Sequence, residues 1–562
     1  MAASFGSTGA RYLPLLMTVG GLGAVPAVAW HRVDRQDRDG FRRSLTFWST
    51  ALPAFAAYKA VEWYAESSPK SIRPSPDQAS LLYESLHEKY SPVVRNATVA
   101  LRGFYLKASQ MMSLRDEFLP KQYLEWCRKM QDQAPVVMTF SEAEQVIKHE
   151  LGITGLSEIF QLVDPHPVGS ASIGQCYRGV LREEYGGHEV AIKVQPENIE
   201  EQFRADLASC RAFCKMALPQ LVQPLDEIES QFLTEFDYRL EAENMEEIRE
   251  KIMPHWGHKV VIPKSHLNLC TKRVLVMEYL RGGTKLLDGL MDFLREEAAR
   301  QGRPVEELER EHVERLRRRK NLSHTTAEAY KQTLRKALVR SLDGLRAAAY
   351  VCTFGTVGHW GLTALPPNTA DLLATVMKVH GEQVFTHGTF NGDPHPGNIL
   401  LMPDGRLGLI DFGQANPARP PPSPSRYRLP PQVKRLDPSF REHMARLVIA
   451  LNEHDDDTTM KILFATGYRH KYNDPEIARR LIAFWLDRDT SPDVIPEGMN
   501  IHQFLEEMEK RDPAVSISQD AVMVCRCSVM IRSLALAFGL RVRTTDYWRP
   551  YAEAYLRSRG SL

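Results

Sequence analysis

One short segment of the chain alternates apolar runs with turn-forming residues in a way that predicts a β-hairpin. Ile399–Leu401 and Leu407–Ile410 are apolar, and Pro403-Asp404-Gly405 between them is a strong turn signal. A hairpin brings its two ends together, and each end of this one carries an oxygen donor. Asn398 stands before the first strand and Asp411 after the second, so the pattern predicts that these two side chains share one small region.

Three upstream segments have patterns typical of regular elements. Val190–Val194 is a β-branched run and predicts a strand that carries Lys193. Phe232–Ala242 mixes apolar and acidic residues and predicts a helix that carries Glu235. Arg273–Leu280 predicts a core strand that ends in a hinge.

The residues around the hairpin are of the kinds that phosphoryl transfer needs. Asp393 precedes Asn398 by five positions, and Ile410-Asp411-Phe412-Gly413 follows the second strand. In kinase-like sites this spacing supplies a carboxylate that orients the acceptor hydroxyl and two oxygen ligands for magnesium. An Asp-Phe-Gly triplet alone is short enough to occur by chance, but the hairpin context favours function. Asp393 would then orient or deprotonate the acceptor, and Asn398 and Asp411 would hold metal.

The upstream segments supply the other half of such a site. Lys193 is placed on its strand to pair with nucleotide phosphates, and Glu235 is its natural ion-pair partner. The loop Pro167–Gln175 lacks a G-x-G-x-x-G pattern, but its small residues still allow the backbone to approach phosphates closely. We expect nucleotide contacts from Lys193, from the loop residues Gly169, Ser170, Ala171 and Ser172, and from the hinge residues Met277, Glu278 and Leu280.

With these segments in view, the chain resembles the UbiB-type atypical kinases, also called aarF-domain or ADCK proteins. The resemblance covers about residues 85–540 and rests on four motifs in order. They are a K-x-G-Q-like helix at Lys107-Ala108-Ser109-Gln110, an Ala-rich loop at Val168–Gln175, an E-x-D segment at Glu235-x-Asp237 with Glu241-Ala242-x-Asn244, and a D-P-H-P-G-N loop at Asp393–Asn398.

The resemblance implies an α+β, two-lobed, protein-kinase-like fold with an N-terminal helical extension. It implies that Lys193 pairs with Glu235, and that Asn398 and Asp411 hold Mg²⁺. Lys107 and Gln110 would project from the extension into the active-site cleft and cover it. The biological role implied is support of isoprenoid quinone or related lipid metabolism in mitochondria or plastids.

Three positions depart from the family pattern. Ser109 replaces a glycine, Gly169 stands where an alanine is usual, and Asn391-Gly392 replaces the common His-Ala before the catalytic aspartate. The serine affects how closely the helix can pack over a nucleotide, and the glycine makes the loop more permissive toward ATP. No departure removes a metal ligand or the strand lysine, so we expect an active nucleotide-binding site.

Composition adds limits to this interpretation. A chain of 562 residues exceeds the usual size of one core, so two lobes plus extensions are expected. Its 71 basic and 70 acidic residues give a net charge of +1, which implies no nucleic-acid or polyphosphate partner. The cysteines form no paired C-x-x-C set with histidines, so we expect no zinc site and reduced thiols. Cys210 and Cys214 fit as small apolar residues on one helix face.

The N-terminal segment has a separate character. Tyr12–Trp30 carries no charge and just reaches the length that crosses a bilayer, and arginines from Arg32 to Arg43 follow it. Arginines on this side of the run would place the chain that follows it in the matrix, stroma or cytosol. An acid-free start suits organelle import or a signal anchor. Leu45–Tyr58 is too short to span and is typical of an interfacial helix. Alternatively, both apolar stretches pack on the catalytic unit.

Three other segments are interpreted from composition. Ala347–Ala370 is uncharged, but spanning there would put Lys193 and Asp393 on opposite sides of a bilayer, so we expect loop and buried helix ends. Asp292–Lys320 is densely charged and predicts a solvated helix, with a phospholipid-headgroup contact as the alternative. Pro417–Pro431 is proline-rich and predicts a linker.

The expected organisation follows from these segments. The predicted domains are a targeting or membrane-associated segment (1–75), a helical K-x-G-Q-type extension (76–165), a kinase-like N-lobe (166–283), a helical and charged insertion (284–383), and a kinase-like C-lobe with a Pro-rich insertion (384–562, insertion 417–431).

We therefore expect an atypical kinase or ATPase that uses ATP with Mg²⁺ or Mn²⁺ and acts with a lipid or quinone-pathway component at an organelle membrane. The expected location is the mitochondrion, at the inner membrane, with the plastid as the alternative. A nucleotide-gated scaffold or lipid carrier is a second interpretation. A Ser/Thr protein kinase is a third, disfavoured by the K-x-x-Q helix and the missing A-P-E motif. The phosphoryl acceptor and the oligomeric state stay open.

Overall fold

The structure is a computed structural model, and the chain forms two compact units. Unit 1 comprises residues 1–239 and 266–276, and unit 2 comprises residues 240–265 and 277–562. The structure describes residues 35–69, 71–112, 120–132, 138–170, 173–217, 222, 225, 229, 234–317, 341, 368–412, 433–488, 491–499, 501–516, 518–538 and 540–561.

Several predicted segments lie outside the described residues. They are Tyr12–Trp30, Pro417–Pro431 and most of Ala347–Ala370. In the described part of the chain, no helix combines the length and apolar character needed to cross a membrane.

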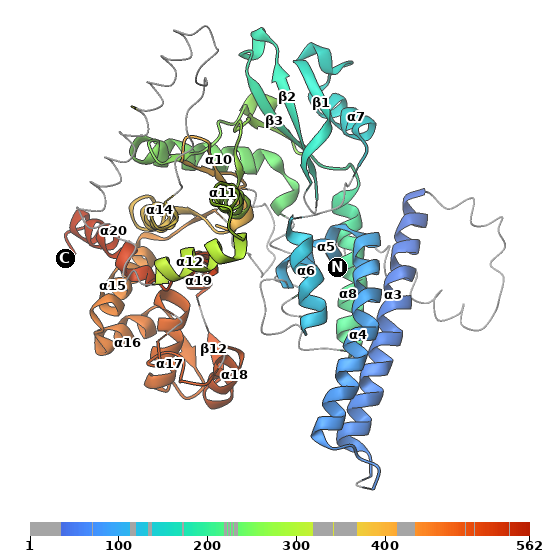
Figure 1. The fold of residues 1–562 in the computed structure, drawn as a ribbon, viewed down its shortest axis with the longest axis vertical. Coiled ribbons are helices and arrows are strands. Elements are labelled where there is room, and N and C mark those ends of the chain that lie inside the picture. Colours follow the sequence, from blue (N-terminus) through green and yellow to red (C-terminus); the bar gives the residue numbers. More distant parts are fainter. Residues whose placement is uncertain are drawn as a thin grey trace, which may run out of the picture. The chain divides into compact units, whose positions relative to one another are not determined.

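Unit 1 contains a four-stranded sheet and a set of helices, drawn in blue to green in Figure 1. Its elements in chain order are α3 (Arg35–Glu62), η1 (Trp63–Ser67), α4 (Pro76–Leu101), α5 (Gly103–Met112), α6 (Lys121–Asp132), α7 (Phe140–Leu151), η2 (Leu156–Glu158), β1 (Phe160–Ser170), β2 (Gln175–Leu181), η3 (Glu183–Tyr185), β3 (Glu189–Val194), α8 (Ile199–Ala217), η5 (Thr234–Phe236) and η6 (Leu267–Leu269), with β5 (Val274–Glu278) crossing into unit 2.

The sheet of unit 1 has the strand order β1-β2-β3-β5. Along β2 every second side chain is buried, as expected of a strand with one face on a core. β3 is nearly continuous in its apolar character and confirms the strand predicted at Val190–Val194. Tyr177 and Ile192 from the sheet pack with Ile147 of α7 in one apolar cluster, which fixes the position of β3 and therefore of Lys193.

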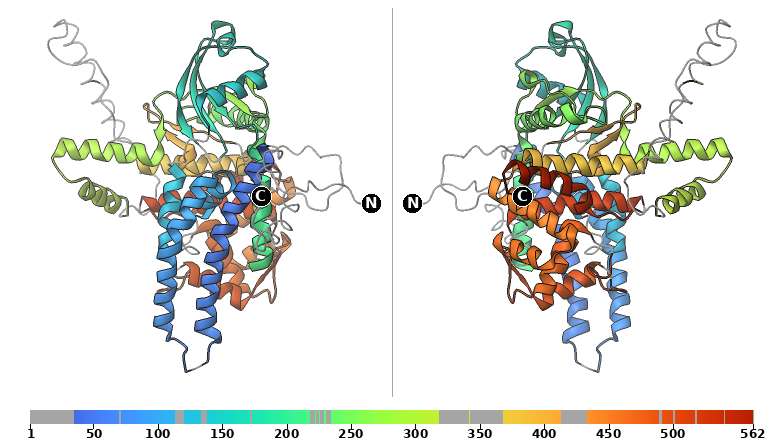
Figure 2. Two further views of the ribbon diagram at one scale, coloured as in Figure 1. Left: turned by 90° about the vertical axis from the view of Figure 1, so that its right-hand side faces the viewer. Right: turned by 90° about the vertical axis from the view of Figure 1, so that its left-hand side faces the viewer.

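Helices α3 and α4 run antiparallel as a long helical hairpin beside α8 (Figures 1 and 2). The α4 helix begins at a capping box between Ser75 and Gln78. Rings from α3 surround Phe213 of α8, with centroids 5.9 Å away for Phe47 and 5.7 Å for Phe55. The structure thus favours the packed alternative for Leu45–Tyr58, because one face of this stretch is used inside unit 1.

The arginines after the first apolar run include one with an internal role. Arg43 of α3 donates from Nε to Asp206 Oδ1 of α8 at 3.0 Å, and it also bonds the carbonyl oxygen of Leu101. This side chain is only 16% exposed. Arg43 therefore has a role in the packing of unit 1, and the prediction that the arginine cluster flanks a membrane interface stays a prediction.

The described residues of unit 2 are mostly helical and form three small sheets. Its elements are α10 (Tyr238–Trp256, of which the first two residues belong to unit 1), β4 (Val260–Val261), β6 (Thr284–Lys285), α11 (Leu286–Gln301), α12 (Val305–Arg317), α14 (Thr369–Glu382), η7 (Gln383–His387), β7 (Thr389–Asn391), η8 (Pro396–Asn398), β8 (Ile399–Leu401), β9 (Leu407–Leu409), β10 (Val433–Arg435), α15 (Pro438–Glu453), α16 (Asp456–Ala465), β11 (Arg469–His470), α17 (Pro475–Ile482), η9 (Ala483–Asp487), α18 (Ile501–Arg511), β12 (Ala514–Ser516), α19 (Gln519–Ala537) and α20 (Thr544–Ser558).

The core of unit 2 forms around α14. Twelve of its residues are buried, as are the first three of the following turn η7. Trp548 of α20 donates from Nε1 to the carbonyl oxygen of Met377 at 3.2 Å. The Trp548 ring also stacks on His380, with centroids 5.5 Å apart. Because α14 leads through η7 into β7, this packing fixes the backbone that enters the Asp393 loop.

The charged stretch that follows the hinge is helical where the structure describes it. α11 and α12 cover Asp292 to Arg317 and expose most of their charged side chains. Arg303 between them bonds Glu307 at 2.9 Å and also Glu311. This agrees with the predicted solvated helix, although Gly302 divides it in two by taking a left-handed conformation at the end of α11. A phospholipid contact stays a prediction.

Candidate functional site

The hairpin of unit 2 confirms the first prediction. β8 and β9 pair antiparallel, with Ile399 opposite Leu409 and Leu401 opposite Leu407. Asn398 ends the short turn η8, and its carbonyl oxygen accepts from Ile410 N at 3.0 Å. The backbones that carry Asn398 and Asp411 are therefore hydrogen-bonded neighbours at the open end of the hairpin.

Asp411 has an unusual backbone conformation. Its φ is +75°, in the left-handed region that side-chain-bearing residues rarely occupy. Such conformations persist only where the surroundings hold them, and they gather at functional sites. An aspartate suits this turn, because Asp and Asn tolerate the left-handed region better than bulkier residues. Phe412 after it is buried and anchors the turn.

Asn391 links the catalytic candidate to the metal-ligand candidate. Its Oδ1 accepts from Asp393 N at 2.9 Å, and its Nδ2 donates to the carbonyl oxygen of Asp411 at 3.3 Å. One amide side chain thus ties the start of the Asp393 loop to the end of the hairpin. The sequence singled out Asn391 only as a departure from the family pattern, and the structure gives it a positioning role.

The backbone of Asn391 is itself held by buried groups. Gln383 Oε1 accepts from Asn391 N at 3.1 Å, and His380 Nε2 lies 3.1 Å from Asn391 O. Burial lowers the pKa of His380 to about 4, so this imidazole is neutral near pH 7 and donates its Nε2 proton to the carbonyl oxygen. A cavity of about 30 Å³ lies among these groups, which suits water and not a nucleotide.

Asp393 has a cationic neighbour that the sequence did not single out. Arg526 of α19 places one guanidinium nitrogen 3.8 Å from Asp393 Oδ1. The two side chains are 31% and 19% exposed, so the pair is half-buried and reachable by a substrate. Arg526 lies on a helix far from Asp393 in sequence. Only its position after the apolar residues of that helix could have suggested that it faces a functional group.

The hinge prediction falls on β5. The strand is confirmed over Val274–Glu278, and the chain passes from unit 1 to unit 2 between Val276 and Met277. Met277 is buried and Glu278 is exposed, with Glu278 N donating to Lys264 O at 2.8 Å. Leu280 accepts from Gly283 N at 3.1 Å. Adenine contacts from these residues stay a prediction.

In unit 1, Lys193 lies on β3 as predicted. Its Nζ is 5.0 Å from the ring centroid of Tyr238, a distance at which an ammonium is attracted to the ring face. Cys176 of β2 is its partner across the strand pair. Its pairing with Glu235 stays a prediction.

The helix predicted at Phe232–Ala242 is wrong as a single element. Thr234–Phe236 forms the short 3₁₀ turn η5, and α10 begins only at Tyr238. Asp237 causes the break, because its Oδ1 accepts from Arg239 N at 3.1 Å in the manner of a helix cap. Glu235 therefore sits on a turn before the helix and is buried there.

Glu235 is bonded by a lysine of the N-terminal extension. Lys107 Nζ donates to Glu235 Oε2 at 2.9 Å, and the side chains are 18% and 8% exposed. Phe104 of α5 and Phe236 of η5 belong to one apolar cluster with α8, which brings the two charged residues together. The carbonyl oxygen of Glu235 accepts from Gln195 Nε2 at 3.0 Å. Gln110 lies on the same helix, α5, but its side chain is outside the described residues.

The loop between β1 and β2 is described in part. Gly169 and Ser170 end β1, whereas Ala171 and Ser172 lie outside the described residues. A Cβ at Gly169 would meet nothing within 4 Å, so the usual alanine would fit there. Gly174 is different, because a Cβ there would lie 2.8 Å from the carbonyl oxygen of Val194. Gly174 lets the loop return close to the strand that carries Lys193.

Comparison with known proteins identifies the domain. The family described as ABC1 atypical kinase-like domain matches residues 129–302 and 364–421. These parts of the chain are similar to an ABC1 atypical kinase-like domain. The match contains Lys193, Glu235, Asp393, Asn398 and Asp411. It confirms the resemblance to the UbiB-type, or ADCK, family that the motifs indicated, and with it the kinase-like α+β fold with N-terminal helices.

Individual relatives agree with this assignment. The chain is 27% identical over 384 residues to the protein ACTIVITY OF BC1 COMPLEX KINASE 3, chloroplastic, of Arabidopsis thaliana, covering 67% of this chain and 42% of that protein. It is 27% identical over 229 residues to AarF domain-containing protein kinase 1 of Xenopus tropicalis, covering 40% and 42%. The chain spans about half or less of the length of such curated relatives.

One solved structure matches this chain at low similarity. The Mycobacterium tuberculosis protein Rv3197, solved in complex with erythromycin, is 18% identical with a TM-score of 0.42, and the match covers 84% of this chain and 97% of that one. So low a score informs neither the substrate nor the site.

Proposed function

We propose that this ABC1-domain chain is an atypical kinase or ATPase that binds ATP with Mg²⁺ or Mn²⁺ and supports isoprenoid quinone or related lipid metabolism at an organelle membrane. The observation that carries the catalytic part is the Asn391 link between the Asp393 loop and Asp411. It supports a site in which an acceptor-orienting carboxylate and two oxygen ligands act together.

The donor set fits a hard cation. Asn398 offers an amide oxygen and Asp411 a carboxylate oxygen, and Mg²⁺ prefers such ligands and keeps several waters. Mg-ATP, when bound, supplies the phosphoryl group and its charge neutralisation. Asp393 would accept the proton of the acceptor hydroxyl, and Arg526 would orient that carboxylate.

The decisive experiment replaces Asp393 by Asn. This change keeps the side chain's size and removes the base, so ATP consumption should fall by about a hundredfold or more, while nucleotide affinity stays near that of the parent. The matched control is Asp404→Asn on the exposed hairpin turn, which should retain activity. Equal ATP consumption by the parent and Asp393→Asn chains would contradict catalysis at this residue.

A nucleotide-gated scaffold or lipid carrier is the second candidate, and one contact favours it. Glu235, the expected partner of Lys193, is engaged by Lys107 of the extension. If Lys107 kept Glu235 away from the strand lysine, the site would turn over slowly, because that lysine and its glutamate must act together in kinases. Turnover that stays undetectable in the parent chain across lipid and quinone-like acceptors would select this candidate.

The acceptor we propose is small and lipid-derived. Lys107 and Gln110 lie three residues apart on α5, and in the family that helix covers the cleft where a peptide would lie. Efficient phosphorylation of generic protein substrates would refute this and favour a Ser/Thr protein kinase. The proposed site of action is a mitochondrial inner membrane, or alternatively a plastid, as the names of chloroplastic relatives suggest.

The membrane part of the proposal rests on the sequence of the N-terminal segment. Tyr12–Trp30 would act as the anchor, and loss of that run would leave the protein peripheral. Resistance of the full-length chain to alkaline carbonate extraction supports the anchor. Extraction of a chain that retains Tyr12–Trp30 would refute it.

A further inference from the structure

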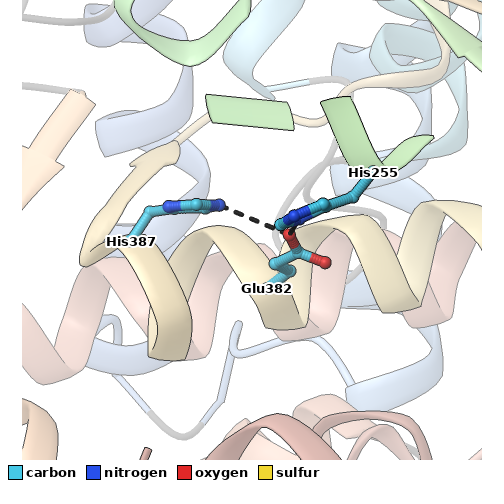
Figure 3. A group of neighbouring side chains, drawn as sticks. All are labelled: His255, Glu382 and His387. Carbon is cyan, nitrogen blue, oxygen red and sulfur yellow. Dashed lines mark hydrogen bonds and ion pairs between the residues drawn. The ribbon is translucent and has the colours of Figure 1, made fainter. Parts of the chain in front are cut away.

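Two histidines and a glutamate converge in unit 2 at a point that the proposed chemistry does not use. His255 at the end of α10 and His387 at the end of η7 both point at Glu382, the last residue of α14 (Figure 3). His255 Nδ1 lies 2.7 Å from Glu382 Oε1, and His387 Nε2 lies 3.3 Å from the same oxygen. The three ligand atoms all lie within 4.8 Å of one another.

A π-helical turn is what brings two of these residues to one face. Glu382 and His387 are five positions apart, which in a regular α-helix would point them about 140° away from each other. The wider η7 turn, in which Gly388 N bonds Gln383 O, moves positions five apart toward the same side. Gly388 then ends the turn with φ +67°, a conformation suited to glycine. Such π-turns occur frequently at functional sites.

The carboxylate of Glu382 is oriented so that one of its two oxygens can coordinate a metal ion. Trp256 donates from Nε1 to Glu382 Oε2 at 2.7 Å, which leaves Oε1 to face the two imidazoles. Glu382 is 8% exposed, whereas His255 is 62% exposed. The carboxylate of Glu382 is therefore oriented as a ligand, and the exposed His255 beside it leaves a path from solvent.

We propose that His255, Glu382 and His387 bind a divalent transition-metal ion of the zinc type. Two imidazole nitrogens and one carboxylate oxygen form a common three-residue zinc ligand set that leaves a fourth position for water. With bonds of about 2.0–2.1 Å, tetrahedral ligands stand roughly 3.3 Å apart, which the His387–Glu382 distance already matches. Imidazole ligands select against Mg²⁺, so this site is distinct from the one proposed at Asn398 and Asp411.

The position of the site gives it a role in holding unit 2 together. A bound ion would join the end of α10 to the turn that leads into β7 and the Asp393 loop. α10 already contacts the same strand one helical turn earlier, where Lys251 Nζ donates to Thr389 Oγ1 at 2.9 Å. We therefore assign the site a structural or regulatory role, with no part in the phosphoryl-transfer step.

Titration of the full metal-free chain with Co²⁺ tests the proposal directly. Cobalt in a His₂Glu site of low coordination number gives strong visible absorption, and one equivalent should produce it. Zn²⁺ should displace the cobalt and abolish the band, whereas excess Mg²⁺ should not. His387→Gln should weaken binding by at least a hundredfold. Absence of a one-equivalent band in the parent chain would overturn the proposal.

Two more variants keep the outcome interpretable. His255→Gln removes the exposed ligand and should also abolish the band, with the fold checked by circular dichroism. Trp256→Phe leaves all three ligands but frees Glu382 Oε2, and such outer-shell losses weaken metal affinity by roughly 10- to 100-fold. The matched control is His188→Gln, because His188 Nε2 faces His266 Nε2 at 3.1 Å in unit 1. Equal loss of cobalt binding in that control would refute the assignment to the trio.

Discussion

The candidate residues of unit 2 and those of unit 1 are held in different ways. In unit 2, Asn391, Asp393, Asn398 and Asp411 lie within one short stretch of chain, and turn and hairpin bonds to nearby backbone groups hold them. In unit 1, Lys107 and Glu235 are 128 positions apart and meet through a mostly buried ion pair.

Because of this difference, substitutions in the two units should affect different properties, catalysis in unit 2 and stability in unit 1. Substitutions in the unit 2 cluster change the chemistry while the fold remains, because local backbone bonds carry most of the geometry. Substitution of the unit 1 ion pair costs stability first, because a buried charge that loses a hydrogen bond keeps its desolvation penalty. The following predictions test this contrast, from the largest expected effect to the smallest.

Replacing Asp411 by Asn should have the largest effect. The change removes the only full negative charge among the two proposed metal ligands, so ATP should no longer raise the melting temperature in a Mg²⁺-dependent way. Thermal unfolding with and without ATP and Mg²⁺ measures this, with Asp404→Asn as control. Unchanged metal-dependent stabilisation would exclude Asp411 as a ligand.

Replacing Asn391 by Ala should come next. No ligand or base is removed, but Asp393 N and Asp411 O both lose their side-chain partner. A displacement of about 1 Å at such a site costs roughly a hundredfold in rate, so ATP consumption should fall on that scale while the unfolding midpoint changes little. A large loss of stability with unchanged turnover per folded molecule would reverse the contrast between the two units.

Replacing Lys107 by Met should act mainly on stability. The methionine keeps the apolar stem but leaves Glu235 without this charged donor, so unfolding of unit 1 should become easier by about 2 kcal/mol. Basal ATP consumption should also change if the Lys107 contact restrains Glu235. Urea unfolding gives the first quantity. The matched control is Lys129→Met, whose partner Glu125 is exposed, and it should shift stability by less than about 0.5 kcal/mol.

The smallest expected effect is on the pH dependence of folding stability, through Asp206. Burial raises the pKa of Asp206 to about 6 against the opposing effect of Arg43, so the folded chain binds more protons than the unfolded chain between about pH 4 and pH 6. Its contribution to stability is therefore full below pH 4 and lost as the pH rises through 6. The unfolding midpoint of the parent chain should therefore fall as the pH rises across this range. Asp206→Asn should lose this pH dependence, and the exposed control Asp292→Asn should keep it.

The comparison also shows which parts of the site could be predicted from sequence. The hairpin and the strand of Lys193 were predicted correctly, because their turn residues and β-branched runs act locally. The helix through Glu235 was predicted wrongly, because the capping bond of Asp237 outweighs the apolar pattern around it. Arg526 was missed, since nothing near it in the chain points to Asp393.

The expectation of no zinc site, which was drawn from the cysteines, shows the same limit of prediction from sequence. Cysteine spacing gave no sign of a metal site, and that inference considered only ligands that are close in sequence. His255 stands 127 positions before Glu382, and the π-turn that brings Glu382 and His387 together has no sequence signal of its own. The trio was visible only after α10 and α14 had packed.

The sequence by itself indicated the resemblance to the family and the kinase-like class of fold through its motifs. It determined the local elements that carry Lys193, Asn398 and Asp411, because short-range turn and strand preferences act within a few residues. Tertiary structure alone decided that Lys107 meets Glu235, that Arg526 faces Asp393, and that two histidines meet Glu382. The physical reason is that each of these groups meets a residue from a distant part of the sequence, where separate elements pack, and that packing depends on the whole unit.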